Sequence, residues 1–158
     1  MTLVVAYAGA DICFMVGDTL LSHEHFALKG DLGPVNGEFH SLKIQILTGE
    51  LAIGFAGNFD VAYSAVAALK FALSVDPTLD PTEWLASRSI TDADFLVLKN
   101  GVRKELFVIE SANVRQAINA HIGDAEEWNR FLQLKKEYSG QLSDTRSMRM
   151  EELCSQTQ

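Results

Sequence analysis

The stretch Thr2 to Asp18, TLVVAYAGADICFMVGD, decides how the chain begins to fold. Two apolar runs rich in β-forming residues, Leu3 to Ala8 and Ile12 to Val16, flank a turn at Gly9 to Asp11. Apolar runs separated by a turn sequence are typical of a β-hairpin, and these predict two strands that are largely buried. In such a hairpin the start of one strand lies beside the end of the other, so we expect Asp18 near Thr2.

A second hairpin is predicted after a loop at residues 22–38. From Ser41 the residue types alternate, and we expect Leu42, Ile44 and Ile46 on one side of a strand and Ser41, Lys43 and Gln45 on the other. Residues 48–50 turn the chain, and residues 51–56 form a further buried strand that ends at Gly57.

The remaining chain alternates between groups of helices and strands. Asn58 is the expected N-cap of a helix to about Val75, and Asp80 to Glu83 (DPTE) is a capping signature for a short helix to about Ser89. Strands follow at 95–99 and 102–110, joined by a two-residue turn at Asn100–Gly101, with a weaker strand at 116–122. Helices are expected at 124–138 and near 148–153. This order predicts stacked sheets with helices outside, rather than a parallel sheet with regular alternation.

Composition narrows the classes of function. The 158 residues are expected to form a single domain, residues 1–158, and the formal net charge of −8 argues against binding nucleic acid or an anionic membrane. Cys13 and Cys154 are far apart, which fits a reducing compartment and suggests neither a disulfide framework nor a zinc site. Because neither a membrane segment nor a signal peptide is recognisable, we expect a cytoplasmic protein. No cofactor is expected.

Thr2 is the first candidate for chemistry. If Met1 is removed, Thr2 becomes the first residue and carries a hydroxyl nucleophile and a free α-amine together. The amine can act as the general base for the hydroxyl, which makes a self-contained pair for nucleophilic catalysis. If Met1 is retained, this base is lost.

Three further residues complete the candidate site. Asp18 ends the second strand of the first hairpin, and Lys43 is expected on the polar face of the third strand. Gly57 ends the fourth strand just before a helix, where backbone N–H groups can hold an oxyanion. Each also has an ordinary interpretation, as a turn residue, a solvated lysine and backbone punctuation, so the hypothesis depends on their combination.

These segments resemble the proteasome β-type subunits and the HslV-type bacterial peptidase. Residues 2–22 are similar to the opening of that family, including the sixteen-residue step from Thr2 to Asp18. Residues 43–57 (KIQILTGELAIGFAG) resemble its lysine strand and alanine–glycine turn, and residues 58–73 fall where its first helix lies. Residues 120–128 (AHIGDAEEW) resemble its Ile-Gly turn before the third helix.

The resemblance implies an N-terminal nucleophile hydrolase with an α+β fold, a four-layer αββα sandwich. Thr2 would attack a peptide carbonyl with help from its α-amine, whose ordinary pKa of about 7.7–8.0 would be lowered by the ammonium of Lys43. Asp18 would hold Lys43 in place, and the N–H of Gly57 would bind the oxyanion. The resemblance further implies a homo-oligomeric ring, peptide substrates and an ATPase unfoldase partner.

The chain also departs from the family pattern. Its loop from Leu21 to His40 is longer, which makes Lys29 a competitor for the role of Lys43. Asp124 follows Gly123 where the family places a serine, and the chain ends where the family adds a further helix and strand pair. These departures leave open a non-catalytic assembly subunit, and a small-molecule amidase is a third alternative. His23 and His25 in a loop are weak candidates for a metal.

Overall fold

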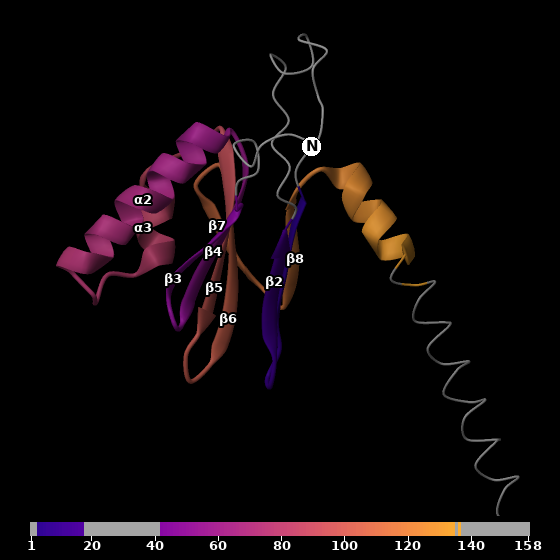
Figure 1. Cartoon of the computed structure of the whole chain (residues 1–158), viewed down its shortest axis with the longest axis horizontal. Helices are drawn as coiled ribbons and strands as arrows, with labels where there is room; N and C mark the ends of the chain where they lie inside the picture. Colours follow the sequence, from indigo (N-terminus) through magenta and orange to yellow (C-terminus); the bar gives the residue numbers. More distant parts are fainter. Residues whose placement is uncertain (1–2, 18–41, 135, 137–158) are drawn as a thin grey trace, which may run out of the picture. The chain divides into compact units, whose positions relative to one another are not determined.

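The computed structural model describes residues 3–17, 42–134 and 136. Residues up to Asp124 form one unit, and those from Ala125 onward form a second. The described part of the first unit contains two antiparallel sheets. The smaller has the order β2-β1-β8, from β1 (Leu3–Ala8), β2 (Cys13–Gly17) and β8 (Asn119–Gly123). The larger has the order β3-β4-β5-β6-β7, from β3 (Ile44–Thr48), β4 (Leu51–Gly57), β5 (Ala93–Asn100), β6 (Lys104–Glu110) and β7 (Asn113–Ala117) (Figure 1).

Strand β1 is the centre of the three-stranded sheet. It pairs with β2 in the register Val4↔Gly17 to Ala8↔Cys13, which confirms the predicted first hairpin. The prediction that both strands are largely buried is wrong for β2, because Phe14 and Val16 are 45% and 60% exposed. Side chains alternate across a sheet, and the described residues of the first unit cover only one face of this sheet, so alternate apolar side chains of β2 stay exposed.

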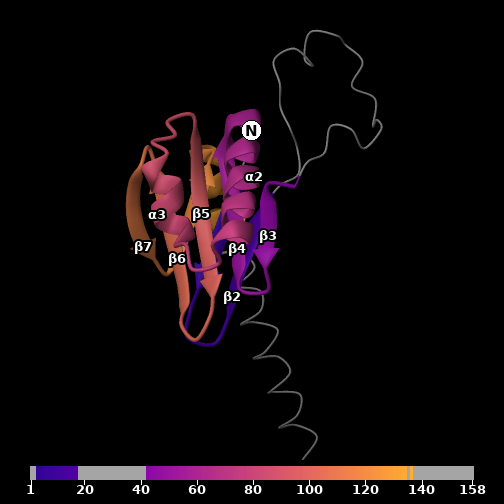
Figure 2. The same cartoon turned by 90° about the vertical axis from the view of Figure 1, so that its left-hand side faces the viewer.

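Two helices cover one face of the five-stranded sheet, α2 (Phe59–Val75) and α3 (Pro81–Ser87) (Figure 2). Asn58 caps α2 as predicted, since its side chain accepts a hydrogen bond from the N–H of Val61 at 3.3 Å. Pro81 is the first residue of α3, also as predicted. The apolar faces of both helices and of the sheet form one core, whose largest buried side chains are Ile53, Phe55, Leu69, Leu85, Phe95 and Val97.

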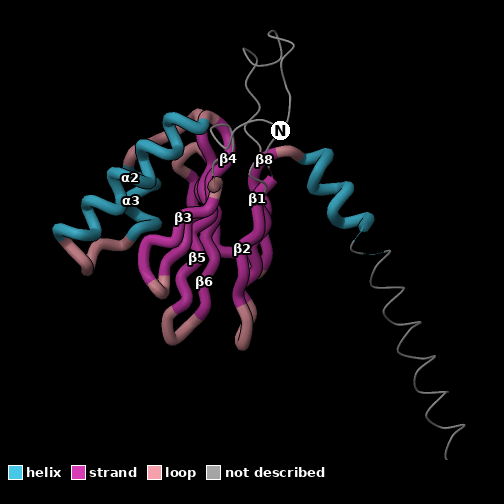
Figure 3. The backbone as a smooth tube through the Cα atoms, in the orientation of Figure 1, coloured by secondary structure: helices cyan, strands magenta, loops and turns pink. Residues whose placement is uncertain are grey.

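The other face of the five-stranded sheet packs against the three-stranded sheet. This second core includes Val4 and Ile122 from one sheet and Leu96 from the other. Gly54 shows how close the sheets are, because a Cβ atom there would lie 2.6 Å from Sδ of Met15 and 2.8 Å from Cγ1 of Val4. The first unit is therefore an αββ arrangement of three layers, in which the helices lie outside the larger sheet (Figure 3).

Three details differ from the sequence-based expectations. Asn100 still belongs to β5 and pairs with Lys104, so the turn between β5 and β6 has three residues instead of two. The strand expected at 116–122 is divided at Ile118 into β7 and β8, which lie in different sheets. The reason is that the N–H of Ala8 donates to the carbonyl of Ile118 at 2.8 Å, which draws the chain from the larger sheet to β1.

The second unit contains a helix at residues 125–134 and 136, within the predicted range 124–138. Trp128 and Phe131 stack on it, with ring centroids 5.4 Å apart. The loop expected at 22–38 and the helix expected near 148–153 lie outside the described residues. In the part of the chain that the structure describes, no helix is long and apolar enough to cross a membrane.

Candidate functional site

Three strand termini of the smaller sheet lie side by side at one end of the sheet. The first residue of β1, Leu3, is in register with the last residue of β8, Gly123, and Val4 is in register with the last residue of β2, Gly17. Thr2 and Asp18 directly flank these positions but lie outside the described residues. Their proximity therefore stays a prediction, and the structure supplies the strand ends to which they are joined.

The prediction that Lys43 lies on the polar face of the third strand is wrong. Lys43 precedes β3, and only 4% of it is exposed, whereas Ile46 is 77% exposed. Gln45, which by alternation shares the face of Lys43, is in register with Ile53, and Ile53 belongs to the core between the larger sheet and its helices. The face predicted to be polar therefore adjoins a buried core. The carbonyl of Lys43 accepts a hydrogen bond from the N–H of Phe55 at 2.9 Å, which fixes the backbone of Lys43 beside the end of β4.

The start of β3 lies next to the end of β2, although the two strands belong to different sheets. A Cβ atom at Gly17 would lie 3.4 Å from Cδ1 of Ile44 and 3.3 Å from Cγ2 of Val4. Gly17 precedes Asp18, and Ile44 follows Lys43. The packing of the two sheets thus brings together the chain segments that carry the predicted carboxylate and the predicted amine.

Gly57 ends β4 in a conformation that other residues rarely adopt. Its φ is +95°, in the region where only glycine is unstrained. A Cβ atom there would lie 2.5 Å from the carbonyl oxygen of Asp92, so the backbone leaves no room for a side chain. The N–H of Asn58 donates to that same oxygen at 2.7 Å. The turn before α2 is therefore held tightly, as an amide that binds an oxyanion would require.

Gly123 has a φ of +101° and leads into Asp124, which follows the strand end opposite Leu3. The expected turn before a helix is therefore present here, with a carboxylate directly after the glycine.

Asp94 is a residue at this end of the sheet that the sequence reasoning missed. It is in register with Ala56, one residue before Gly57, and by alternation it shares the face of Leu96, toward the smaller sheet. Partial burial raises the pKa of the Asp94 carboxyl, and the nearby charge of Glu110 raises it further. The strand predicted from the sequence begins at Phe95, whereas β5 begins at Ala93, so the prediction leaves Asp94 outside the strand.

His121 on β8 is the other titratable group with a shifted pKa near this edge. Burial lowers the pKa of its imidazole, while the charge of Glu110 opposes and that of Arg115 reinforces the shift. Arg115 and Glu110 also form an ion pair, with Nε and Oε2 3.6 Å apart. The described ranges contain no group of three metal-ligating side chains, and His23 and His25 lie outside them.

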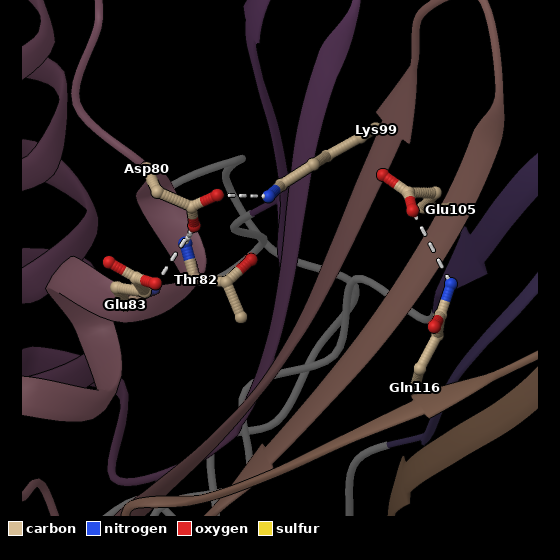
Figure 4. A network of polar contacts seen from close by, with 6 residues as sticks. All are labelled: Asp80, Thr82, Glu83, Lys99, Glu105 and Gln116. Atoms are coloured by element: carbon tan, nitrogen blue, oxygen red, sulfur yellow. Dashed lines mark hydrogen bonds and ion pairs between the residues drawn. The ribbon is translucent and has the colours of Figure 1, made fainter.

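A polar network at the opposite end of the larger sheet stabilises α3. Nζ of Lys99 lies 2.7 Å from Oδ2 of Asp80, whose Oδ1 accepts from the N–H groups of Thr82 and Glu83 (Figure 4). Desolvation acts to raise the pKa of the Asp80 carboxyl, but the hydrogen bonds and the charge of Lys99 together lower it. Lys99 is in register with Leu51, at the far end of β4 from Gly57, so this network is separate from the candidate site.

Comparison with known proteins identifies the fold. The structure is similar to the crystal structure of eukaryotic HslV from Trypanosoma brucei, with a TM-score of 0.56 and 20% sequence identity. The alignment covers 78% of this chain and 72% of that chain. No protein-family model and no curated protein sequence matches this chain. The fold expected from the resemblance to HslV is therefore supported by structure, as a mixed arrangement of antiparallel sheets and helices.

Proposed function

We propose that this chain is a subunit of a proteasome-like, threonine-type peptidase, with Thr2 as the nucleophile after removal of Met1. The observation that carries the proposal is the convergence of strand ends on one edge of the two sheets. There β1 begins, β2 and β8 end, and β3 begins beside the end of β4. The similarity of the fold to HslV supports the same assignment.

The register of the smaller sheet supports the placement of the reacting groups. If the ladder continued beyond the described pair Val4↔Gly17, the next pair would join Leu3 to residue 18. In the same way, continuation beyond Leu3↔Gly123 would join residue 2 to Asp124. We therefore propose that the hydroxyl of Thr2 lies next to the carboxylates of Asp18 and Asp124, and that the larger sheet contributes Lys43 to the same site.

The conformation of Gly57 supports its role as oxyanion donor. Backbone N–H groups alternate in direction along a strand, and Phe55 donates toward Lys43, just before β3, whereas Asn58 donates toward Asp92. By this alternation the N–H of Gly57 is expected on the Lys43 side. A fixed amide aimed at the developing oxyanion contributes about 3–4 kcal/mol to catalysis in hydrolases.

The chemistry would need no cofactor. The α-amine of Thr2 takes the hydroxyl proton as the oxygen attacks the peptide carbonyl, and the same proton passes to the leaving amine. Water then hydrolyses the ester, which regenerates the hydroxyl. The positive charge of Lys43 disfavours protonation of the α-amine, and Asp18 orients Lys43.

The test begins with the mass of the N-terminus of the purified full chain and with a covalent probe for N-terminal threonine. We expect Met1 to be absent, Thr2 to be labelled and peptide hydrolysis to be abolished in Thr2→Ala. Lys43→Ala is expected to reduce kcat by at least about a hundredfold, the order of a general acid–base effect. Lys104→Ala, which removes a lysine at the far end of the sheet, is the matched control and should retain full activity.

Retention of Met1, or equal hydrolysis by Thr2→Ala, would contradict the peptidase proposal. The second candidate is then a non-catalytic subunit that only assembles, which the extra carboxylate of Asp124 favours. Asp124→Ser separates the two, because a gain of probe labelling in that variant would show a site inhibited by one side chain. A panel of small amides beside the peptides tests the amidase alternative.

The proposal also includes a fourth layer, on the outer face of the smaller sheet. Phe14 and Val16 leave apolar surface on the outer face of the smaller sheet, and the helix at 125–134 carries Trp128, Phe131 and Leu132. We propose that a further helical layer covers that face and completes a four-layer αββα sandwich. Cytoplasmic location, assembly into a homo-oligomeric ring and cooperation with an ATPase unfoldase are further parts of the proposal, and size measurement by light scattering tests the ring.

A further inference from the structure

Helix α2 carries an apolar row on the side that faces away from the sheet. Tyr63, Phe71 and Val75 are 48%, 72% and 71% exposed, and Ala67 between them is exposed as well. These residues follow one another at intervals of four, so they form a continuous row along the helix. The exposed side of a helix in a soluble domain is ordinarily polar. We call this row, together with its exposed neighbours Asp60, Ser64, Ala68 and Lys70, the α2 ridge.

The charges of the helix are arranged for a partner that runs in the opposite direction. Asp60 lies in the first turn, and Lys70 lies in the second half; they are the two charged residues of α2. An antiparallel copy of the same helix therefore presents a lysine near Asp60 and an aspartate near Lys70. A parallel copy would instead place like charges together.

We propose that the α2 ridge is a self-association surface, on which the ridge of a second copy of this chain packs antiparallel about a two-fold axis at Ala67. With that axis, Tyr63 comes opposite the partner's Phe71, and Ser64 comes opposite the partner's Lys70. The centre of the contact then consists of small residues, Ala67, Ala68 and Ser64. These let the two helices approach closely while each Phe71 fills the space beside the partner's Ala67.

The electrostatic fit strengthens the antiparallel arrangement. A two-fold axis perpendicular to the helices keeps Tyr63 and the partner's Lys70 on the same flank of the contact. The partner's Lys70 then lies over the ring of Tyr63 and within its side-chain reach of Asp60. Each interface therefore gains two equivalent ion pairs and two cation–π contacts.

The contact is expected to be weak. One helix on each side buries less than the roughly 1,200 Å² of total surface that specific, stable interfaces reach. We therefore expect a dimer that forms between micromolar and millimolar concentration. The inference does not depend on the peptidase proposal, because it uses no residue of the candidate site and an isologous contact differs from the heterologous contacts of a ring.

Sedimentation velocity of the full chain over this concentration range tests the inference. We expect Phe71→Glu to weaken association by at least about tenfold, because it removes the aromatic side chain that packs beside the partner's Ala67 and places a charge in the apolar contact. The matched control is Val102→Glu, which changes a fully exposed apolar residue in the turn between β5 and β6 and should leave association unchanged. Circular dichroism confirms that both variants keep the fold.

Charge exchange separates specific pairing from general stickiness. Asp60→Lys and Lys70→Asp should each weaken self-association severalfold, whereas an equimolar mixture of the two variants should form a heterodimer at least as well as the unchanged chain. In Ala67→Cys, oxidation should give a disulfide between two copies of residue 67, identified by peptide mapping. A chain that is monomeric near millimolar concentration would overturn the inference. So would equal effects of Phe71→Glu and Val102→Glu, or failure of the mixture to associate.

Discussion

The two sheets of the first unit differ in how their faces are covered. The central strands of the five-stranded sheet, β4, β5 and β6, are buried on both faces, by α2 and α3 on one side and by the smaller sheet on the other. The three-stranded sheet is buried on its inner face, where Val4 and Ala6 are fully inaccessible. Its outer face keeps Phe14 and Val16 substantially exposed within the same unit. Strands of similar apolar content thus serve different roles, according to the layers around them.

This difference shows where the stability of the fold should be concentrated. Side chains between the sheets contact neighbours from two layers, and their truncation leaves a cavity that cannot collapse easily. Side chains on the outer face of the smaller sheet depend on a further layer for burial. Truncations between the sheets and truncations on the outer face can therefore be compared by their loss of unfolding free energy. A large loss on the outer face would indicate a further layer.

The largest loss is expected at the shared core between the sheets. Leu96 is fully buried there, and Leu96→Ala should lower the free energy of unfolding by about 2–5 kcal/mol, from lost burial and the cavity left behind. Val102→Ala, in a fully exposed turn, should change it by less than about 0.5 kcal/mol. Urea unfolding followed by circular dichroism measures both, and similar values for the two variants would refute the two-sheet core.

Close approach of the sheets gives the next largest effect. Gly54→Ala places a Cβ atom against Met15 and Val4, and this overpacking should cost about 1–3 kcal/mol of unfolding free energy. Gly49→Ala is the matched control, because no atom lies within 4 Å of a Cβ built there. Thermal melts of the two variants compare them directly. Equal melting temperatures would mean that the sheets separate without cost at this point.

The outer face of the smaller sheet tests for a fourth layer. Phe14 stacks on Tyr7 with ring centroids 5.6 Å apart, and Phe14→Ala should cost about 1 kcal/mol if only that pair is lost, and about 3 kcal/mol if a helix also covers it. Urea unfolding followed by circular dichroism measures this loss. A value of about 1 kcal/mol would mean that no further layer covers the outer face of the smaller sheet.

Most secondary structure was accessible from the sequence because local signals agree with the final fold. Asn58 and Asp80 cap their helices with side-chain oxygens, an interaction within four residues that needs no tertiary information. The hairpin of β1 and β2 follows from a turn of four residues, whose ends are joined by the hydrogen bond from Gly9 to Ile12 at 2.9 Å.

The arrangement of distant strands was not accessible in the same way. The division at Ile118 depends on pairing between β1 and β8, more than a hundred residues apart in sequence, which no local pattern encodes. The burial of Lys43 likewise depends on tertiary packing, because the face that it shares with Gln45 adjoins the core between the larger sheet and its helices. Of the candidate site, the end of β4 at Gly57 lies where the sequence predicts it, while the roles of Thr2, Asp18, Lys43 and Gly57 stay predictions.

The smallest expected effects have opposite sign at the two ends of β5. Asp80 has a lowered pKa, so its contribution to stability is present above its ordinary pKa of 3.8 and is lost as pH falls through the folded value. Asp80→Ala should cost about 1 kcal/mol near pH 7 through the lost N-cap, and less below pH 3.8. Asp94 has a raised pKa, so its charge opposes folding at neutral pH.

Asp94→Asn should therefore raise the melting temperature slightly at pH 7, and the gain should shrink as pH falls through the folded pKa and vanish below 3.8. Melting curves from pH 3 to pH 7 for both variants and the unchanged chain measure the two trends, which are expected to run in opposite directions. Parallel trends would mean that the carboxylate near Gly57 is as well stabilised as the one paired with Lys99. The carboxyl groups of Asp94 and Asp80 would then contribute to stability in the same way, although Asp94 is partly desolvated and Asp80 is paired with Lys99.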